Sequence, residues 1–351
     1  GAAIAQPLHA VFASTTHDAD APMTSAARCR GACAVLGLLA GALASGAEEW
    51  CAPEAAGRSD SSVLLARRSR SSSSAEAEGL QEDEDHDEEG ATPWSAMVII
   101  DSNYIPVFDC WWSAFVRSGS RTPLRLGGLD EGASEALRSK LQPALLEGAG
   151  DPLVEVIDLQ PRPGLSLLQS AGSPPSFLTT FWKAMRTSIV SSPGGSLHCD
   201  ADALWVRSPD RMIRQALRAH PEADIVAQAS FGAKSTRSSK KWGFVINTGF
   251  TLFRKTPGVL AMVDSFLAAN QTHFEQGVLN NYLLTLGCQW NQTHDKRSTT
   301  LTVGRCGNLT VLLLPASRVS RVWHTEQQLT IYHADIHHLT SLPELRGMGL
   351  C

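Results

Sequence analysis

The feature that most constrains this chain is a short apolar run, beginning at Ser196, that ends in the two aspartates Asp200 and Asp202. Because side chains alternate along an extended strand, we expect both carboxylates to point to the same side of a strand end. Two close carboxylates repel, and a divalent cation with oxygen ligands is the usual way to keep both ionised. Such a cation keeps open positions for phosphate oxygens, so the pair predicts a nucleoside diphosphate site. The alternative is a pair that only caps the next helix.

Further motifs follow the aspartates in a defined order. They are Trp205 with Pro209, the strand-like run Asn247-Thr248-Gly249-Phe250, the pair Glu275-Gln276 and, near the end, His333. In this order the chain resembles the nucleotide-diphospho-sugar transferase family, which includes plant cell-wall xylosyl-, arabinosyl- and galactosyltransferases. The resemblance covers roughly residues 97–351. The chain departs from the family at Ser208 and Glu275, where Asp is usual, and at Cys351, where Trp is usual.

The resemblance implies an α/β protein with the GT-A glycosyltransferase fold, a mixed and mostly parallel sheet whose first half is Rossmann-like. The apolar pattern agrees, because a strand-like run at 97–100 leads through a loop into helical spacing at 105–119. In open α/β sheets a nucleotide docks at the loop after such a strand. The segment 230–241, rich in Ser and Lys, is expected to be a mobile surface loop. The alternative is that it closes over the diphosphate or holds an acidic acceptor.

The activity implied by the family is metal-dependent transfer of a sugar from a nucleotide-diphosphate donor, of the UDP-sugar type, to a glycan or glycoprotein acceptor. Retention at the anomeric carbon is implied as well. Glu275 and Gln276 are the candidate catalytic residues, positioned to steady an oxocarbenium-like centre. They begin a predicted helix at 274–286, so a capping role for the glutamate is the alternative.

The predicted metal ligands are Asp200, Asp202 and His333. The two carboxylates call for a third ligand, and an imidazole suits Mn²⁺ better than Mg²⁺, which is the second choice of cofactor. The neighbouring His337 and His338 leave the choice of histidine open.

Two groups of residues are candidate donor contacts. Asn103 and Tyr104 follow the first strand and match the opening of the family, where they would meet the base or ribose; a turn Asn with a packing Tyr is the alternative. Lys183, on a predicted helix at 176–190, is a further candidate. The run Asn247-Thr248-Gly249 is expected to meet sugar hydroxyls, since a buried Asn requires partners and a Gly permits close approach. A structural Asn is the competing interpretation.

Composition divides the chain into four parts. Residues 1–22 are interpreted as an upstream or non-native extension, and the basic start and apolar run of 23–47 as a signal peptide or, alternatively, a membrane anchor. Residues 48–93 are acidic, rich in Ser and poor in aromatics, which is typical of a disordered stem. The remaining residues, 94–351, form the predicted catalytic domain, with 24 Lys and Arg against 20 Asp and Glu, a net charge of +4.

Cysteines and glycosylation sequons both favour an oxidising compartment. Cys288 and Cys306 lie at the two ends of a polar segment, where a disulfide would close an exposed loop. Cys110 and Cys199 lie in apolar runs and are expected to be buried thiols. Three sequons begin at Asn270, Asn291 and Asn308. We therefore expect a protein of the secretory pathway, in the Golgi lumen, without a nucleic-acid partner.

Two other functions compete with sugar transfer. The first is a phosphohydrolase, which would use the aspartates as nucleophile and acid. Such enzymes usually carry the pair on the first strand, with a small hydroxyl residue soon after. Here Ala203 and Leu204 follow the pair. The second is a non-catalytic sugar-binding or scaffold protein that retains the fold. The presence of the metal-ligand set together with Asn247 and Gln276 favours the enzyme.

Overall fold

The computed structural model of the protein describes residues 92–146, 153–159, 175–232, 236–269, 274–323, 329–334 and 342–351. All of them belong to a compact unit that spans Glu82–Cys351. The predicted extension, targeting segment and nearly all of the stem lie outside the described residues, as do Asn270, His337 and His338. Among the helices that are described, none has the length and apolar character needed to cross a membrane.

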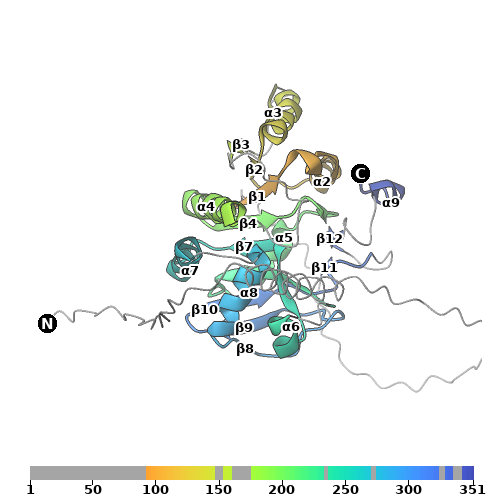
Figure 1. Cartoon of the computed structure of the whole chain (residues 1–351). Coiled ribbons are helices and arrows are strands. Elements are labelled where there is room, and N and C mark those ends of the chain that lie inside the picture. Colours follow the sequence, from red (N-terminus) through yellow and green to blue (C-terminus); the bar gives the residue numbers. More distant parts are fainter. Residues whose placement is uncertain are drawn as a thin grey trace, which may run out of the picture. The chain divides into compact units, whose positions relative to one another are not determined.

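The core of the molecule is a nine-stranded mixed sheet with the order β3-β2-β1-β4-β7-β6-β10-β9-β8 (Figure 1). Its strands are β1 (Trp94–Ile100), β2 (Leu124–Gly128), β3 (Val154–Asp158), β4 (Gly195–Cys199), β6 (Ile225–Ser230), β7 (Val245–Phe253), β8 (Gln289–Trp290), β9 (Thr302–Cys306) and β10 (Leu309–Leu313). The run from β3 to β4 is parallel, as in a Rossmann unit, and β7 then pairs antiparallel with both β4 and β6. The predicted α/β class with a mixed sheet is confirmed.

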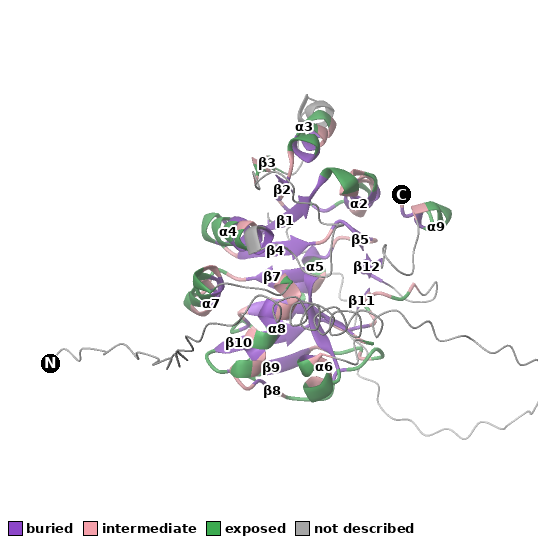
Figure 2. Ribbon diagram, in the orientation of Figure 1, coloured by how far each residue is buried: buried purple, intermediate pink, exposed green. Residues whose placement is uncertain are grey.

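Helices cover both faces of this sheet. They are α2 (Ile105–Ser118), α3 (Glu131–Leu146), α4 (Pro175–Ser191), α5 (Asp210–Ala219), α6 (Arg237–Trp242), α7 (Pro257–Ala268), α8 (Glu275–Thr285) and α9 (Leu342–Gly347), with a short 3-10 helix, η2, at Ser102–Tyr104. Strand β1 shows the division: Val98 and Ile100 belong to the core on the α2 side, whereas Met97 and Ile99 belong to the core on the α4 side. This alternation is why β1 is buried along its whole length (Figure 2).

A second, three-stranded sheet brings the end of the chain to the aspartates. It consists of β5 (Ala203–Trp205), β11 (Val319–Ser320) and β12 (Ile331–His333), with β12 in the centre. Strand β12 runs antiparallel to β5, and its register pairs His333 with Ala203. The late histidine therefore lies directly opposite the turn that carries Asp200 and Asp202.

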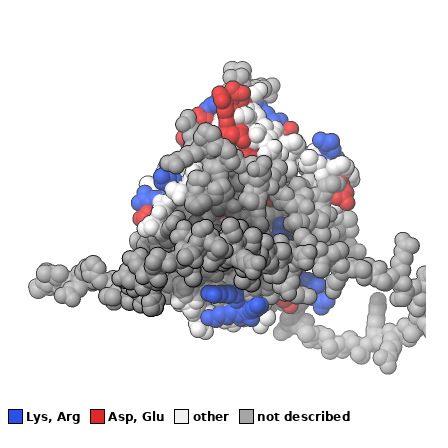
Figure 3. All heavy atoms as spheres, in the orientation of Figure 1, with Lys and Arg blue, Asp and Glu red and all other residues white. Residues whose placement is uncertain are grey.

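The segment expected to be a mobile loop, 230–241, is partly helical. Thr236 caps α6 by accepting a hydrogen bond from the backbone N–H of Ser239 through its side chain, and Gly243 ends the helix in the left-handed region at φ 85°. The exposed Arg237, Lys240 and Lys241 gather on α6, and Figure 3 shows Lys and Arg side chains on this part of the surface. Ser and Lys occur in both loops and helices, so the composition of this segment did not reveal the helix.

Two disulfides cross-link the structure. Cys288–Cys306 closes the short excursion as predicted. The prediction that Cys110 is a thiol was wrong, because it bonds Cys351 across 241 residues of sequence. A buried half-cystine is as apolar as a buried thiol, so the apolar run around Cys110 could not distinguish them. Cys199 is a buried free thiol, as expected, and its Sγ accepts hydrogen bonds from the indole N–H groups of Trp111 and Trp205 at 3.3 and 3.2 Å.

Candidate active site

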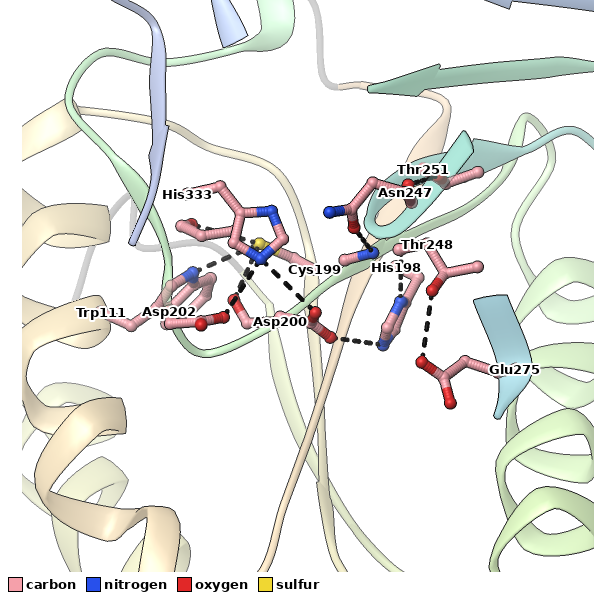
Figure 4. A network of polar contacts seen from close by, with 12 residues as sticks. Trp111, His198, Cys199, Asp200, Asp202, Asn247, Thr248, Thr251, Glu275 and His333 are labelled. Atoms are coloured by element: carbon pink, nitrogen blue, oxygen red, sulfur yellow. Dashed lines mark hydrogen bonds and ion pairs between the residues drawn. The ribbon is translucent and has the colours of Figure 1, made fainter. Parts of the chain in front are cut away.

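Two carboxylates and one imidazole converge beside the middle of the main sheet (Figure 4). The Nε2 atom of His333 lies 3.3 Å from Oδ1 of Asp202 and 3.6 Å from Oδ2 of Asp200. The ligand atoms of the three residues all lie within 4.8 Å of one another. Asp202 and His333 are buried, and Asp200 is half-buried. We call these three residues the acid–histidine cluster.

A turn, rather than strand alternation, brings the two aspartates together. Strand β4 ends at Cys199 and β5 begins at Ala203, so both carboxylates lie between strands. The turn is closed by the Ala203 N–H, which donates to the carbonyl of Asp200 at 3.0 Å, and the backbone N–H of Asp200 donates to the carbonyl of Gly249 at 2.8 Å. The two carboxylates lie close together, as predicted. The prediction that strand alternation would bring them together was wrong.

Gly249 allows this cluster to pack against β7. A Cβ atom at this position would lie 2.0 Å from Oδ2 of Asp200 and 2.4 Å from Cε1 of His333, well inside contact distance. Its neighbour Asn247 is buried, and its Oδ1 accepts a hydrogen bond from the Gly249 N–H at 2.7 Å. In the structure, Gly249 leaves space for the cluster and Asn247 holds the backbone of Gly249 in place. The contact of this motif with a donor sugar stays a prediction.

A second polar chain leads from the cluster to α8. The Nδ1–H of His198 donates to the carbonyl of Thr248 at 2.7 Å, while its Nε2 lies 3.7 Å from Oδ1 of Asp200. The hydroxyl of Thr248 donates to Oε1 of Glu275 at 3.3 Å. Burial lowers the pKa of His198, and burial together with the charge of Asp200 raises the pKa of Glu275. Glu275 therefore faces the acid–histidine cluster through one layer of side chains.

The helix that carries the candidate catalytic pair begins as predicted. Glu275 and Gln276 are the first residues of α8, and both are half-buried. Asn280, one turn on, fixes the helix to β7: its Oδ1 accepts from the Ile246 N–H at 2.9 Å, and its Nδ2 donates to the Ile246 carbonyl at 2.7 Å. The start of α8 is therefore held in place by the strand that carries Thr248.

The remaining predicted donor contacts lie on other elements. Asn103 and Tyr104 form η2 after β1, where their backbone N–H groups donate to Oδ1 of Asp101 at 3.0 and 3.1 Å. The side chain of Asn103 is exposed. Lys183 is exposed on α4. Their roles in donor binding stay predictions.

Two residues of the site were not identified from the sequence. His198 lies two residues before Asp200, and the same alternation argument could have placed it on the same side of the strand. Gln228, on β6, lies beside His333, with His333 Nδ1 2.8 Å from Gln228 Oε1. No motif surrounds Gln228, so the sequence carried no signal for it.

Comparison with known proteins finds a family whose model matches part of the chain. The model of the nucleotide-diphospho-sugar transferase family matches residues 195–341, a stretch that contains the whole acid–histidine cluster and the Asn247 and Glu275 motifs. Over this stretch the chain is similar to that family. Its members are glycosyltransferases, so the resemblance inferred from the order of motifs is confirmed over the matched residues. No curated protein sequence matches the chain.

Solved structures of glycosyltransferases are similar to this chain at low sequence identity. The galactosyltransferase LgtC, in complex with donor and acceptor sugar analogs, is 15% identical, with 69% of this chain and 87% of that chain covered and a TM-score of 0.42. Mouse xyloside xylosyltransferase 1 in its apo form is 12% identical, with 70% of this chain and 99% of that chain covered and a TM-score of 0.44.

Proposed function

We propose that this chain transfers a sugar from a nucleotide-diphosphate donor, of the UDP-sugar type, to a glycan or glycoprotein acceptor, with retention at the anomeric carbon. The observation that carries the proposal is the acid–histidine cluster, which lies within the segment matched by the family. Two carboxylates held close together repel each other, and this repulsion costs free energy unless a cation offsets it.

The side chains of the cluster fit a divalent cation. Two carboxylate oxygens and one imidazole nitrogen present themselves from a single side, and this mixed set of donors suits Mn²⁺ better than Mg²⁺. Gly249 leaves room for the side chains of Asp200 and His333 to approach each other. Asp200, Asp202 and His333 would hold the ion. When bound, it neutralises charge that develops on the leaving nucleoside diphosphate.

Residues on α8 and β7 face the sugar in this proposal. Glu275 is oriented by the Thr248 hydroxyl, and its neighbour Gln276 occupies the next position at the helix start. Backbone N–H groups at a helix start carry a partial positive charge, which favours groups that bear negative charge. Glu275 and Gln276 would steady positive charge on the anomeric carbon through the oxygen atoms of their side chains.

A screen of nucleotide sugars tests the activity. We expect residues 82–351 to hydrolyse at least one UDP-sugar slowly in the presence of Mn²⁺, and to stop when EDTA removes the ion. Release of nucleoside diphosphate, followed by chromatography, measures the reaction. A protein that binds nucleotide sugars with Mn²⁺ but releases no diphosphate from any of them, with or without glycan acceptors, would instead be the sugar-binding alternative.

We propose further that the protein works in the secretory pathway, in the Golgi lumen. Two disulfides support this location, because such bonds persist in oxidising compartments and are rare in the cytosol. Asn291 and Asn308, which begin two of the sequons, are exposed.

The location predicts two covalent properties of the protein purified from its native host. Removal of glycans by an endoglycosidase should increase the electrophoretic mobility, and Cys288 and Cys306 should react with an alkylating reagent only after reduction. Mass spectrometry of the peptides assigns both results. An unglycosylated protein with alkylated Cys288 and Cys306 before reduction would place it outside the secretory pathway.

A further inference from the structure

Gln228 lies in the interior beside the acid–histidine cluster. It belongs to β6, and its side chain is 1% exposed. Its Oε1 lies 2.8 Å from Nδ1 of His333, which is itself 1% exposed. Since a carbonyl oxygen can only accept, this contact is a hydrogen bond when His333 carries its proton on Nδ1.

The position of that proton decides whether His333 can bind a metal ion. A neutral imidazole has one N–H, so a proton on Nδ1 leaves the lone pair on Nε2 available. Nε2 is the atom that faces Asp200 and Asp202, at 3.6 and 3.3 Å. Without a partner for Nδ1, the two carboxylates would favour the other tautomer, in which Nε2–H points at them and no lone pair is available to a cation.

The amide nitrogen of Gln228 contributes no hydrogen bond of its own within the described residues. This Nε2 atom is buried, which is a costly state for a donor in that situation. The fold therefore gains nothing from the amide N–H groups at this position. What the side chain supplies is the acceptor on His333.

We propose that Gln228 is a positioning residue that holds His333 in the tautomer protonated on Nδ1, so that Nε2 can bind the divalent cation. This proposal rests on the proposed function, because the cation is part of that function. It assigns to β6 a role in metal binding although β6 supplies no ligand. Gln228 acts through His333 and does not touch the substrate in this proposal.

Substitutions at Gln228 separate the acceptor from the volume of the side chain. Gln228→Met keeps the length but removes the acceptor, whereas Gln228→Glu keeps an acceptor oxygen. Thr251→Val is the matched control, because Thr251 is a fully buried residue of β7 that lies outside the acid–histidine cluster. ¹⁵N chemical shifts of the His333 imidazole in metal-free protein report the tautomer, and electron paramagnetic resonance of free Mn²⁺ reports the affinity.

We expect metal-free wild-type protein and Gln228→Glu to carry the proton of neutral His333 on Nδ1. Gln228→Met should move it to Nε2 and weaken Mn²⁺ binding by about 10–100-fold, the range typical of losing an outer partner of a metal-bound histidine. Thr251→Val should leave both properties unchanged.

Two results would overturn the proposal: a proton on Nε2 in metal-free wild-type protein, or wild-type Mn²⁺ affinity in a folded Gln228→Met variant. If wild-type protein fails to bind Mn²⁺ at all, the proposed metal-dependent function fails. The tautomer measurement in metal-free protein still decides the role of Gln228 in that case.

Discussion

Asp202→Asn is expected to abolish the Mn²⁺-dependent binding of a nucleoside diphosphate, and Asp200→Asn should do the same. Each change removes a charged ligand that would contact the ion directly. Losing a residue that only supports a ligand typically lowers metal affinity by about 10–100-fold, so we expect a larger loss here. Thermal stability should stay nearly constant or rise, because the substitution relieves repulsion between carboxylates in the metal-free protein. Calorimetric titration with UDP, with and without Mn²⁺, measures the effect.

Asp264→Asn provides the control for these variants. Asp264, on α7, pairs with Arg186 on α4 at 2.5 Å and is exposed, so its loss should change stability little and leave nucleotide binding intact. If Asp200→Asn and Asp202→Asn bind UDP with unchanged Mn²⁺ dependence, the acid–histidine cluster is not the metal site.

Gly249→Ala should be nearly as damaging as the loss of a ligand, although it removes no polar atom. The new Cβ would lie 2.0 Å from Oδ2 of Asp200 and 2.4 Å from Cε1 of His333, so the carboxylate and the imidazole must move apart. We expect Mn²⁺ affinity to fall by about 10–100-fold or more, the range typical of losing a residue that supports a metal ligand. The free energy of unfolding should fall by about 1–3 kcal/mol, as it does when other protein interiors are overpacked. Electron paramagnetic resonance and urea denaturation measure the two effects.

Gly347→Ala is the matched substitution. Gly347 ends α9, and a Cβ atom there meets no atom within 4 Å. It should therefore change neither metal affinity nor stability appreciably. Wild-type Mn²⁺ affinity in Gly249→Ala would mean that β7 yields around the added methyl group, and the steric role assigned to this glycine would be wrong.

The sequence was most informative where a motif lies within one element. The strand around Asn247 and the helix that begins at Glu275 both occur where the apolar pattern predicted them, because hydrophobic periodicity and helix starts are local properties. The disulfide Cys288–Cys306 was also predictable, since its two halves bracket one short excursion of 18 residues.

Interactions between distant segments were the ones that the sequence did not reveal. The bond between Cys110 and Cys351, and the contact of Gln228 with His333, join residues that only the assembled sheets bring together. Asp200 and Asp202 show an intermediate case. Their proximity followed from their spacing, but the turn that produces it depends on the pairing of β5 with β12 and on the backbone of Gly249.

The pairing of β12 with β5 also joins two parts of the site that the ribosome makes at different times. His333 is added to the growing chain 131 residues after Asp202, although the two side chains end up in contact. At the usual rate of about 5–20 residues per second, the ribosome needs on the order of 10 s to make the intervening segment. The central strands β1, β4, β6 and β7 are complete before then. The strands of the main sheet around the aspartates are therefore synthesised before the third member of the acid–histidine cluster.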